Sequence, residues 1–208
     1  MWGSIIVCVL TSYLLGNLNG AVCMSALVAN DDVRSHGSGN AGLTNFIRNY
    51  GVGSSLYVVL IDAGKAVLAC LTSGLILGQF GLREEGMVLG GVCVMLGHVF
   101  PALLGFKGGK GILSGWFIAW VVDWRIGLLI FLVFALAYAL TQYVSLGSVL
   151  GAATFSVCFA IFHHDNLFVM IGGIFIGALA VFMHRGNIVR LVKGQERKTN
   201  LFAKSKKD

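Results

Sequence analysis

The residues best suited to chemistry stand in the stretch 106–111, where Lys107 and Lys110 lie among three glycines between two long apolar runs. The glycines let the backbone bend so that several N–H groups can face one anion. A helix starting near Ile112 would point its positive N-terminal end at the same place. Because the stretch lacks the pattern G-x-x-x-x-G-K-[ST], it does not indicate a nucleotide P-loop. It predicts a phosphate cradle, and a plain glycine-rich turn is the alternative.

We expect the two lysines of this cradle to differ in role. Lys107 is predicted to be the catalytic contact, with the amides of Gly108 and Gly109 holding phosphate beside it. Lys110 would support phosphate binding from the first turn of the following helix. His98 is expected to anchor the cradle rather than to take part in the reaction.

A second polar cluster covers residues 37–48, where glycines again interrupt apolar sequence. Its short side chains supply neutral hydrogen-bonding groups, and Arg48 supplies a planar guanidinium that suits phosphate. The short side chains that we predict to contact substrate are Ser38, Asn40, Thr44 and Asn45. A turn followed by a helix N-cap is the alternative interpretation.

A third polar cluster begins at His184 and ends at Glu196. If its first part is helical, His184, Asn187 and Arg190 recur every third residue and share one face. The alternative is a stop-transfer sequence whose cations only fix topology. Ser145 follows the short polar stretch before a later apolar run, and is either a helix cap or a substrate contact.

Composition defines the setting of these clusters. Of 208 residues, 57% are hydrophobic and 12% are charged, and the mean hydropathy is +0.84. These values predict an all-α integral membrane protein. Within its second apolar run, Asp62 and Lys65 lie three residues apart, so we expect a pair that neutralises itself and helps to orient the site.

The apolar runs predict a single membrane domain with seven transmembrane helices. The fourth run has only eleven residues, which rise about 16 Å as a helix. We expect this helix to begin inside the cradle, and the alternative is a bilayer that is thin there. The predicted spans are about 3–28, 53–78, 87–104, 108–122, 127–140, 146–162 and 167–183.

The distribution of basic residues predicts the orientation. With seven spans, twelve lysines and arginines fall on one side, and only Arg83 and Arg125 fall on the other. The positive-inside rule then places the C-terminus and all three polar clusters in the cytoplasm, and the N-terminus outside. Residues 193–208 form a basic cytoplasmic tail in this scheme, and the net charge of +6 is mostly a topology signal. The basic residues are not interleaved with aromatic ones, so we predict no nucleic-acid partner.

Brought to one membrane face, the cations of the three clusters make a site for more than one phosphate group. A phosphate monoester carries about −1.5 to −2 charges at neutral pH, so two such substrates need several cations to overcome their repulsion. A soluble phosphate compound that meets a lipid-tailed one would explain why the site is mounted on a membrane bundle.

In this order and spacing, the motifs resemble the bacterial acyl-phosphate:glycerol-3-phosphate acyltransferase family of the PlsY type. The similarity runs from Ser12 to Glu196, nearly the whole chain. The strings that carry it are Gly37-Ser38-Gly39-Asn40-Ala41-Gly42-Leu43-Thr44-Asn45, Gly97-His98-Val99-Phe100-Pro101 with Phe106-Lys107-Gly108-Gly109-Lys110-Gly111, Tyr143-Val144-Ser145-Leu146, and His184-Arg185-Gly186-Asn187-Ile188-Val189-Arg190-Leu191.

The resemblance implies a multi-pass enzyme of the bacterial cell membrane, without metal or organic cofactor, whose active site faces the cytoplasm. It would move a fatty acyl group from acyl phosphate to the 1-hydroxyl of glycerol 3-phosphate, giving lysophosphatidic acid. The soluble enzyme that makes acyl phosphate is a candidate partner. Gln142 stands where an arginine is frequent, which weakens an anion-binding role for the loop 141–147. The residues carried over as functional are Ser38, Arg48, Lys107, Ser145, His184, Asn187 and Glu196.

Because an acyl phosphate is an activated mixed anhydride, we expect direct attack without a covalent acyl-enzyme. The base would be His184 or a phosphate oxygen of a substrate. The competing hypothesis is a transporter for a phosphorylated metabolite, which would place the same cations near the bilayer midplane. Here they lie at span ends, which favours the enzyme.

Overall fold

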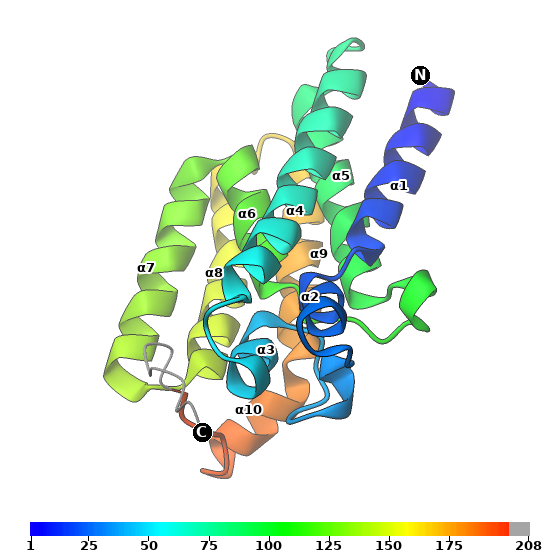
Figure 1. Ribbon diagram of the computed structural model, residues 1–208. Helices are drawn as coiled ribbons and strands as arrows, with labels where there is room; N and C mark the ends of the chain where they lie inside the picture. The colour runs from blue at the N-terminus through cyan, green and yellow to red at the C-terminus, as the bar shows by residue number, and fades with distance from the viewer. Residues whose placement is uncertain (200–208) are drawn as a thin grey trace.

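The computed structural model describes residues 1–199 and is all-helical over that range (Figure 1). The last residues of the expected basic tail, 200–208, lie outside the described residues. The helices are α1 (Trp2–Asn17), α2 (Gly20–Ala29), α3 (Leu43–Tyr50), α4 (Ser55–Gly78), α5 (Arg83–Val99), α6 (Ile112–Val122), α7 (Trp124–Thr141), α8 (Val144–Phe162), α9 (Leu167–Met183) and α10 (Arg185–Val192), with the short 3₁₀ turns η1 (Val33–Ser35) and η2 (Ala102–Leu104).

The helices form one bundle with two halves. On one side α5 packs against α1 and α4, and on the other α8 packs between α7 and α9. The short helix α6 lies between the halves and contacts both α4 and α7, while α5 also packs on α9 (Figure 1). Many large side chains on the outside of this bundle are apolar, for example Leu27, Leu75 and Leu140. A lipid environment suits that surface.

Glycine lets the helices of the first half approach closely. A Cβ on Gly16 of α1 would lie 2.7 Å from the Cα of Gly97 in α5. Between α4 and α5, a Cβ on Gly86 would lie 2.5 Å from the carbonyl oxygen of Ser73. Such contacts leave no space for a larger residue, which is the packing that small residues provide in membrane bundles.

The first apolar run, expected as a continuous span over 3–28, is two helices separated by Leu18 and Asn19. The break frees backbone groups that must find partners in an apolar setting. Lys65 Nζ donates to the carbonyl of Leu18 at 2.5 Å, and the amide of Gly20 donates to Asp62 Oδ1 at 3.1 Å. The Asn19 side chain caps α2 by accepting from the amide of Val22. Polar side chains therefore support the irregular backbone here.

The expectation that the fourth apolar helix begins inside the cradle is wrong. Helix α6 begins at Ile112, and the residue before it, Gly111, is left-handed with φ of +78°. This backbone angle does not continue a right-handed helix, so residues 105–111 stay a loop outside the membrane-spanning helices. Lys110 therefore reaches the site from a loop.

Five helical segments are long and apolar enough to cross a membrane, and the bent pair α9 and α10 makes a sixth, within residues 1–199. Helix α6, with 11 residues, is apolar but short. The fold is therefore that of an all-helical membrane protein, as predicted. The start of α1 and the helix α10 lie at opposite ends of the bundle (Figure 1).

Candidate active site

A cavity of about 840 Å³ opens among the three polar clusters and continues between the helices. Its polar end is lined by Ser38, Asn40, Thr44, Asn45, Arg48, Lys110, Ser145, His184, Asn187, Arg190 and Glu196. Its apolar part is lined by side chains that include Trp116, Ile130, Phe131, Phe134, Phe155 and Ile176, from α6, α7, α8 and α9. The clusters predicted from sequence therefore meet at one place, next to an apolar space.

The cluster 37–48 is shaped by the side chain of Asn45. Asn45 Nδ2 donates to the carbonyls of Val33 at 2.9 Å and His36 at 3.1 Å, while its Oδ1 accepts from the amide of Ser38 at 3.0 Å. Asn45 is 3% exposed, so its main effect is to hold the loop that presents Ser38. Asn45 was predicted as a substrate contact, and its amide instead bonds to protein in this structure.

Helix α3 carries Arg48 into the cavity because its other face is buried. Phe46 is fully buried with Val33 and Val58 in a small core beneath the helix. Arg48 is on the polar side, and its guanidinium donates to the hydroxyl of Thr199. Burial lowers the pKa of Arg48, yet an arginine stays charged at any physiological pH. The site thus holds a permanent cation.

Gly108 and Gly109 of the cradle pack against His98 and do not line the cavity. The amide of Gly109 donates to the carbonyl of His98 at 3.1 Å, and a Cβ on Gly108 or on Gly109 would overlap atoms of His98. The prediction that both amides hold phosphate does not fit this geometry, because the Gly109 amide is already bonded and the cavity lining includes neither glycine. The prediction that His98 anchors the cradle is confirmed.

The structure places the two lysines of the cradle in different surroundings. Lys107 is exposed and does not line the cavity. Lys110 lines it and donates to Asn187 Oδ1 of α10. Burial lowers the pKa of Lys110 to about 8, and the positive charge of Arg190 acts in the same direction. This difference in position follows from the loop, whose last residues turn inward toward α6. The predicted catalytic role of Lys107 stays a prediction.

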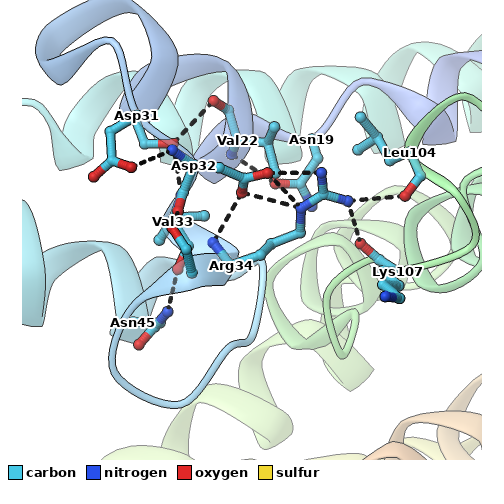
Figure 2. A network of polar contacts seen from close by, with 11 residues as sticks. Asn19, Val22, Asp31, Asp32, Val33, Arg34, Asn45, Leu104 and Lys107 are labelled. Atoms are coloured by element: carbon cyan, nitrogen blue, oxygen red, sulfur yellow. Dashed lines mark hydrogen bonds and ion pairs between the residues drawn. The ribbon is translucent and has the colours of Figure 1, made fainter.

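Arg34 is a residue that sequence reasoning missed, and it joins the cluster 37–48 to the cradle. Figure 2 shows its guanidinium between the Asp32 carboxylate and the cradle. Arg34 Nη1 donates to the carbonyls of Leu104 at 2.8 Å and Lys107 at 3.2 Å, and Nε and Nη2 bind Asp32. Only the Asp-x-Arg spacing next to the glycines could have pointed to it, because an arginine two residues after an N-cap aspartate can fold back on it.

The third cluster is held together by Glu196. Glu196 Oε1 accepts from Asn187 Nδ2 at 2.8 Å, and Oε2 accepts from Arg190 Nε at 2.7 Å. Burial opposes ionisation of this carboxyl, but the hydrogen bonds from Asn187 and Arg190 lower its pKa below the ordinary value. Glu196, one of the residues carried over from the resemblance, therefore orders the cations around it. A role for it in substrate binding stays a prediction.

His184 and Ser145 present polar atoms to the same space. His184 Nδ1 lies 2.8 Å from the carbonyl of Ala180, and since a carbonyl can only accept, this nitrogen carries the proton and Nε2 has a lone pair. Ser145 is 7% exposed, and its hydroxyl lies near the Glu196 carboxyl and helps to lower the pKa of that group, although it makes no hydrogen bond of ordinary geometry within residues 1–199. A buried hydroxyl with such a loose contact still has hydrogen-bonding capacity, so it can bind a polar ligand in the cavity.

Beside the cavity, Asp62 and Lys65 form the pair that their spacing predicts. Lys65 Nζ lies 2.8 Å from Asp62 Oδ1 and 2.8 Å from His98 Nδ1. Through His98 this pair is connected to the cradle, and through Leu18 to the break between α1 and α2. The interpretation as a structural pair that also orients the site agrees with these contacts.

Fold and cavity together define a class: a helical membrane protein in which a cationic pocket at one end of the bundle continues into an apolar space. Comparison with known proteins narrows this class. The chain belongs to the glycerol-3-phosphate acyltransferase family, whose model matches residues 6–194.

Two named relatives show the extent of the similarity. A glycerol-3-phosphate acyltransferase of Finegoldia magna is 36% identical over 186 residues, 89% of this chain and 91% of the relative. One from Clostridioides difficile is 37% identical over 203 residues, 94% and 95% of the two chains. The resemblance inferred from the motifs is therefore confirmed.

Two solved structures share the fold. Both are crystal structures of PlsY (YgiH), described as an integral membrane glycerol 3-phosphate acyltransferase. The glycerol 3-phosphate form is 31% identical with a TM-score of 0.86, over 97% of this chain and 100% of that one. The lysophosphatidic acid form is 30% identical with a TM-score of 0.82, over 96% and 97% of the two chains.

Proposed function

We propose that this protein transfers a fatty acyl group from acyl phosphate to the 1-hydroxyl of glycerol 3-phosphate, giving lysophosphatidic acid and inorganic phosphate. The observation that carries the proposal is the continuity of one cavity from a cationic end to an apolar part. Phosphate groups fit the first and an acyl chain fits the second. The family and the forms in which its solved member was crystallised support glycerol 3-phosphate as the acceptor.

The reaction needs positioning and charge stabilisation more than a nucleophile on the protein. The acceptor hydroxyl oxygen attacks the carbonyl carbon of the acyl phosphate, the new ester C–O bond forms, and the C–O bond to phosphate breaks. Arg48 and Lys110 stabilise the negative charge of the departing phosphate. The proton of the hydroxyl passes to His184 Nε2 or to a phosphate oxygen of a substrate.

Within the cavity, Ser145 and Ser38 are the candidates for orienting the acceptor hydroxyl or the carbonyl. The position of the Ser145 hydroxyl in the cavity wall beside Glu196 supports its part in this. Asn187 holds Lys110 and Glu196 at the same time, so it orders two charged groups of the site.

The site would lie at the cytoplasmic face of a bacterial plasma membrane that the chain crosses seven times. The twelve basic residues predicted on one side, with α10 and the start of α1 at opposite ends of the bundle, support this topology. It requires α6 to cross a bilayer that is locally thin. A membrane-impermeant thiol reagent should modify a cysteine placed at Lys193 only from the cytoplasmic side, and one placed at Trp2 only from outside. Modification of both from the same side would contradict an odd number of spans.

The experiment that tests the function compares three acyl-donor conditions on one preparation of the protein. Proteoliposomes are given labelled glycerol 3-phosphate with acyl phosphate, with an acyl thioester, or with no donor. We expect labelled lysophosphatidic acid with acyl phosphate alone. Product with the thioester would reassign the donor, and uptake of label without product would favour a transporter.

A further inference from the structure

The chain does not leave the site after α10 but turns back across it. Gly194 is left-handed with φ of +66°, and the amide of Gln195 donates to the carbonyl of Arg190 at 2.8 Å. Residues Gln195–Thr199, which we name the strap, then run from α10 toward the end of α7 (Figure 1). Glu196, bound to Asn187 and Arg190, fixes the first part of the strap.

The far part of the strap is fixed on the turn between α7 and α8. The amide of Thr199 donates to the carbonyl of Gln142 at 3.2 Å, and the hydroxyl of Tyr138 donates to the carbonyl of Thr199 at 2.9 Å. Gln142 is left-handed with φ of +62°, which ends α7 and leaves its carbonyl free to accept. Lys198 Nζ also lies 5.6 Å from the centre of the Tyr143 ring.

The side chain of Thr199 points from this turn to the opposite wall of the cavity. Thr199 is 6% exposed, and its hydroxyl accepts from Arg48 Nη2 of α3. The strap therefore links α3 to the α7–α8 turn across the polar end. The family model ends at residue 194, before the strap.

Among the described residues, the Arg48 guanidinium makes one hydrogen bond, to Thr199. Because arginine has five N–H donors in a fixed plane, this bond leaves other donors for a ligand. An arginine side chain loses much rotamer freedom when it is held in one place. If that loss occurs before the substrate arrives, binding is stronger. Glu196 attracts Arg48, while Arg197 and Arg190 repel it. The hydrogen bond to Thr199 adds a contact of defined direction to these opposing charges.

We propose that the strap is a wall of the phosphate end of the cavity and that Thr199 is a positioning residue which holds Arg48 toward the phosphate of glycerol 3-phosphate. The inference rests on the proposed function, since it takes this phosphate as the ligand of Arg48. Thr199 acts through Arg48 and touches no reacting atom.

Thr199→Val tests this, because valine keeps the shape and removes the hydroxyl. We expect KM for glycerol 3-phosphate to rise about 3- to 10-fold, with kcat within about twofold of the unchanged protein. Thr199→Ser, which restores a hydroxyl, should return KM to near its original value. Thr154→Val is the matched control, since the Thr154 hydroxyl bonds to the carbonyl of Leu150 on an exposed side of α8.

Three results would overturn the inference. They are an unchanged KM in Thr199→Val, a KM that falls because the hydroxyl competes with phosphate, and a serine variant as impaired as the valine variant. A lower unfolding temperature with unchanged KM would reduce Thr199 to a structural tie and overturn it too.

A binding measurement separates this test from the proposed function. Glycerol 3-phosphate should raise the unfolding temperature of the full chain in detergent, and raise it less in Thr199→Val than in Thr154→Val. If no acyl transfer occurs but this difference is found, the proposed function fails and the positioning role stands. If transfer occurs and both variants respond equally, the positioning role fails alone.

Discussion

The polar end of the cavity and the cluster around Asp62 both concentrate charge, but they balance it differently. In the cluster, Lys65 and Asp62 neutralise each other, and backbone groups of the α1–α2 break complete their bonding. At the polar end, Arg48, Lys110 and Arg190 face Glu196, which leaves an excess of positive charge. Charges whose partners all lie within the protein hold structure together. A surplus of one sign marks the place where a substrate of the other sign binds.

The largest effect should come from breaking the balanced cluster. Lys65→Met leaves the Asp62 carboxylate buried without its cation, which is expected to cost about 3–5 kcal/mol of stability. The free energy of unfolding in detergent measures this, and the amount of folded protein should fall with it. The double variant Asp62→Asn with Lys65→Met removes both charges and should regain part of the loss. Normal stability of Lys65→Met would show that the cluster does not hold the fold.

At the polar end, substitution of Lys110 should lower activity without lowering stability, and the same substitution of Lys107 serves as the matched control. Lys110→Met removes a cation that lines the cavity, so kcat/KM should fall about 10²–10³-fold while the unfolding temperature stays close to normal. Lys107→Met should lower kcat/KM by less than about threefold, since surface substitutions have small effects. Steady-state kinetics on the two purified variants provide the comparison. A larger loss in Lys107→Met than in Lys110→Met would support the ranking that we made from sequence.

Arg34 allows a test of how strongly the cradle depends on its support. Arg34→Gln removes the bonds to the carbonyls of Leu104 and Lys107, so KM for glycerol 3-phosphate should rise about tenfold, the scale of a charged hydrogen bond. Arg125→Gln is the control, because Arg125 binds Asp123 in the same Asp-x-Arg arrangement, in the turn between α6 and α7. If both substitutions raise KM equally, the support of the cradle by Arg34 does not explain the change in KM.

The smallest effect concerns pH. The pKa of Lys110 is lowered to about 8, so the free protein loses this positive charge as pH rises through 8, and binding of a phosphate dianion weakens. The phosphate itself becomes a dianion above about pH 6. We therefore expect kcat/KM for glycerol 3-phosphate to be greatest between about pH 6 and 8, and to fall up to tenfold per unit above it.

Lys110→Arg sharpens this test because a guanidinium does not lose its proton in that range. The alkaline fall in kcat/KM should disappear in this variant, even if its maximum is lower. If the fall persists at the same pH, another group is titrating.

Much of the site could be predicted because its residues interrupt apolar sequence. Ser38, Arg48 and His184 stand out in a chain where few residues are polar, and the family resemblance orders them. The fate of Lys107 and Lys110 could not be predicted, since it depends on the left-handed turn at Gly111 that directs one lysine inward.

The other omissions have related causes. Arg34 and Thr199 act through backbone carbonyls and another side chain, and such partners leave no pattern of residue types. The break at Leu18 was hidden because every residue around it continues an apolar run except the two asparagines, Asn17 and Asn19. It is stable only because Lys65 and Asp62, far along the chain, satisfy its backbone.

The central claim is that the protein transfers an acyl group from one phosphate compound to another, in a cavity whose cationic end binds the phosphates and whose apolar part binds the acyl chain. The most direct measurement is the amount of inorganic phosphate and of lysophosphatidic acid that the reconstituted protein forms from acyl phosphate and glycerol 3-phosphate. We predict equal amounts of both, formed by the unchanged protein and about 10²–10³-fold more slowly by folded Lys110→Met. Phosphate release without lysophosphatidic acid, or equal rates in both proteins, would contradict the account.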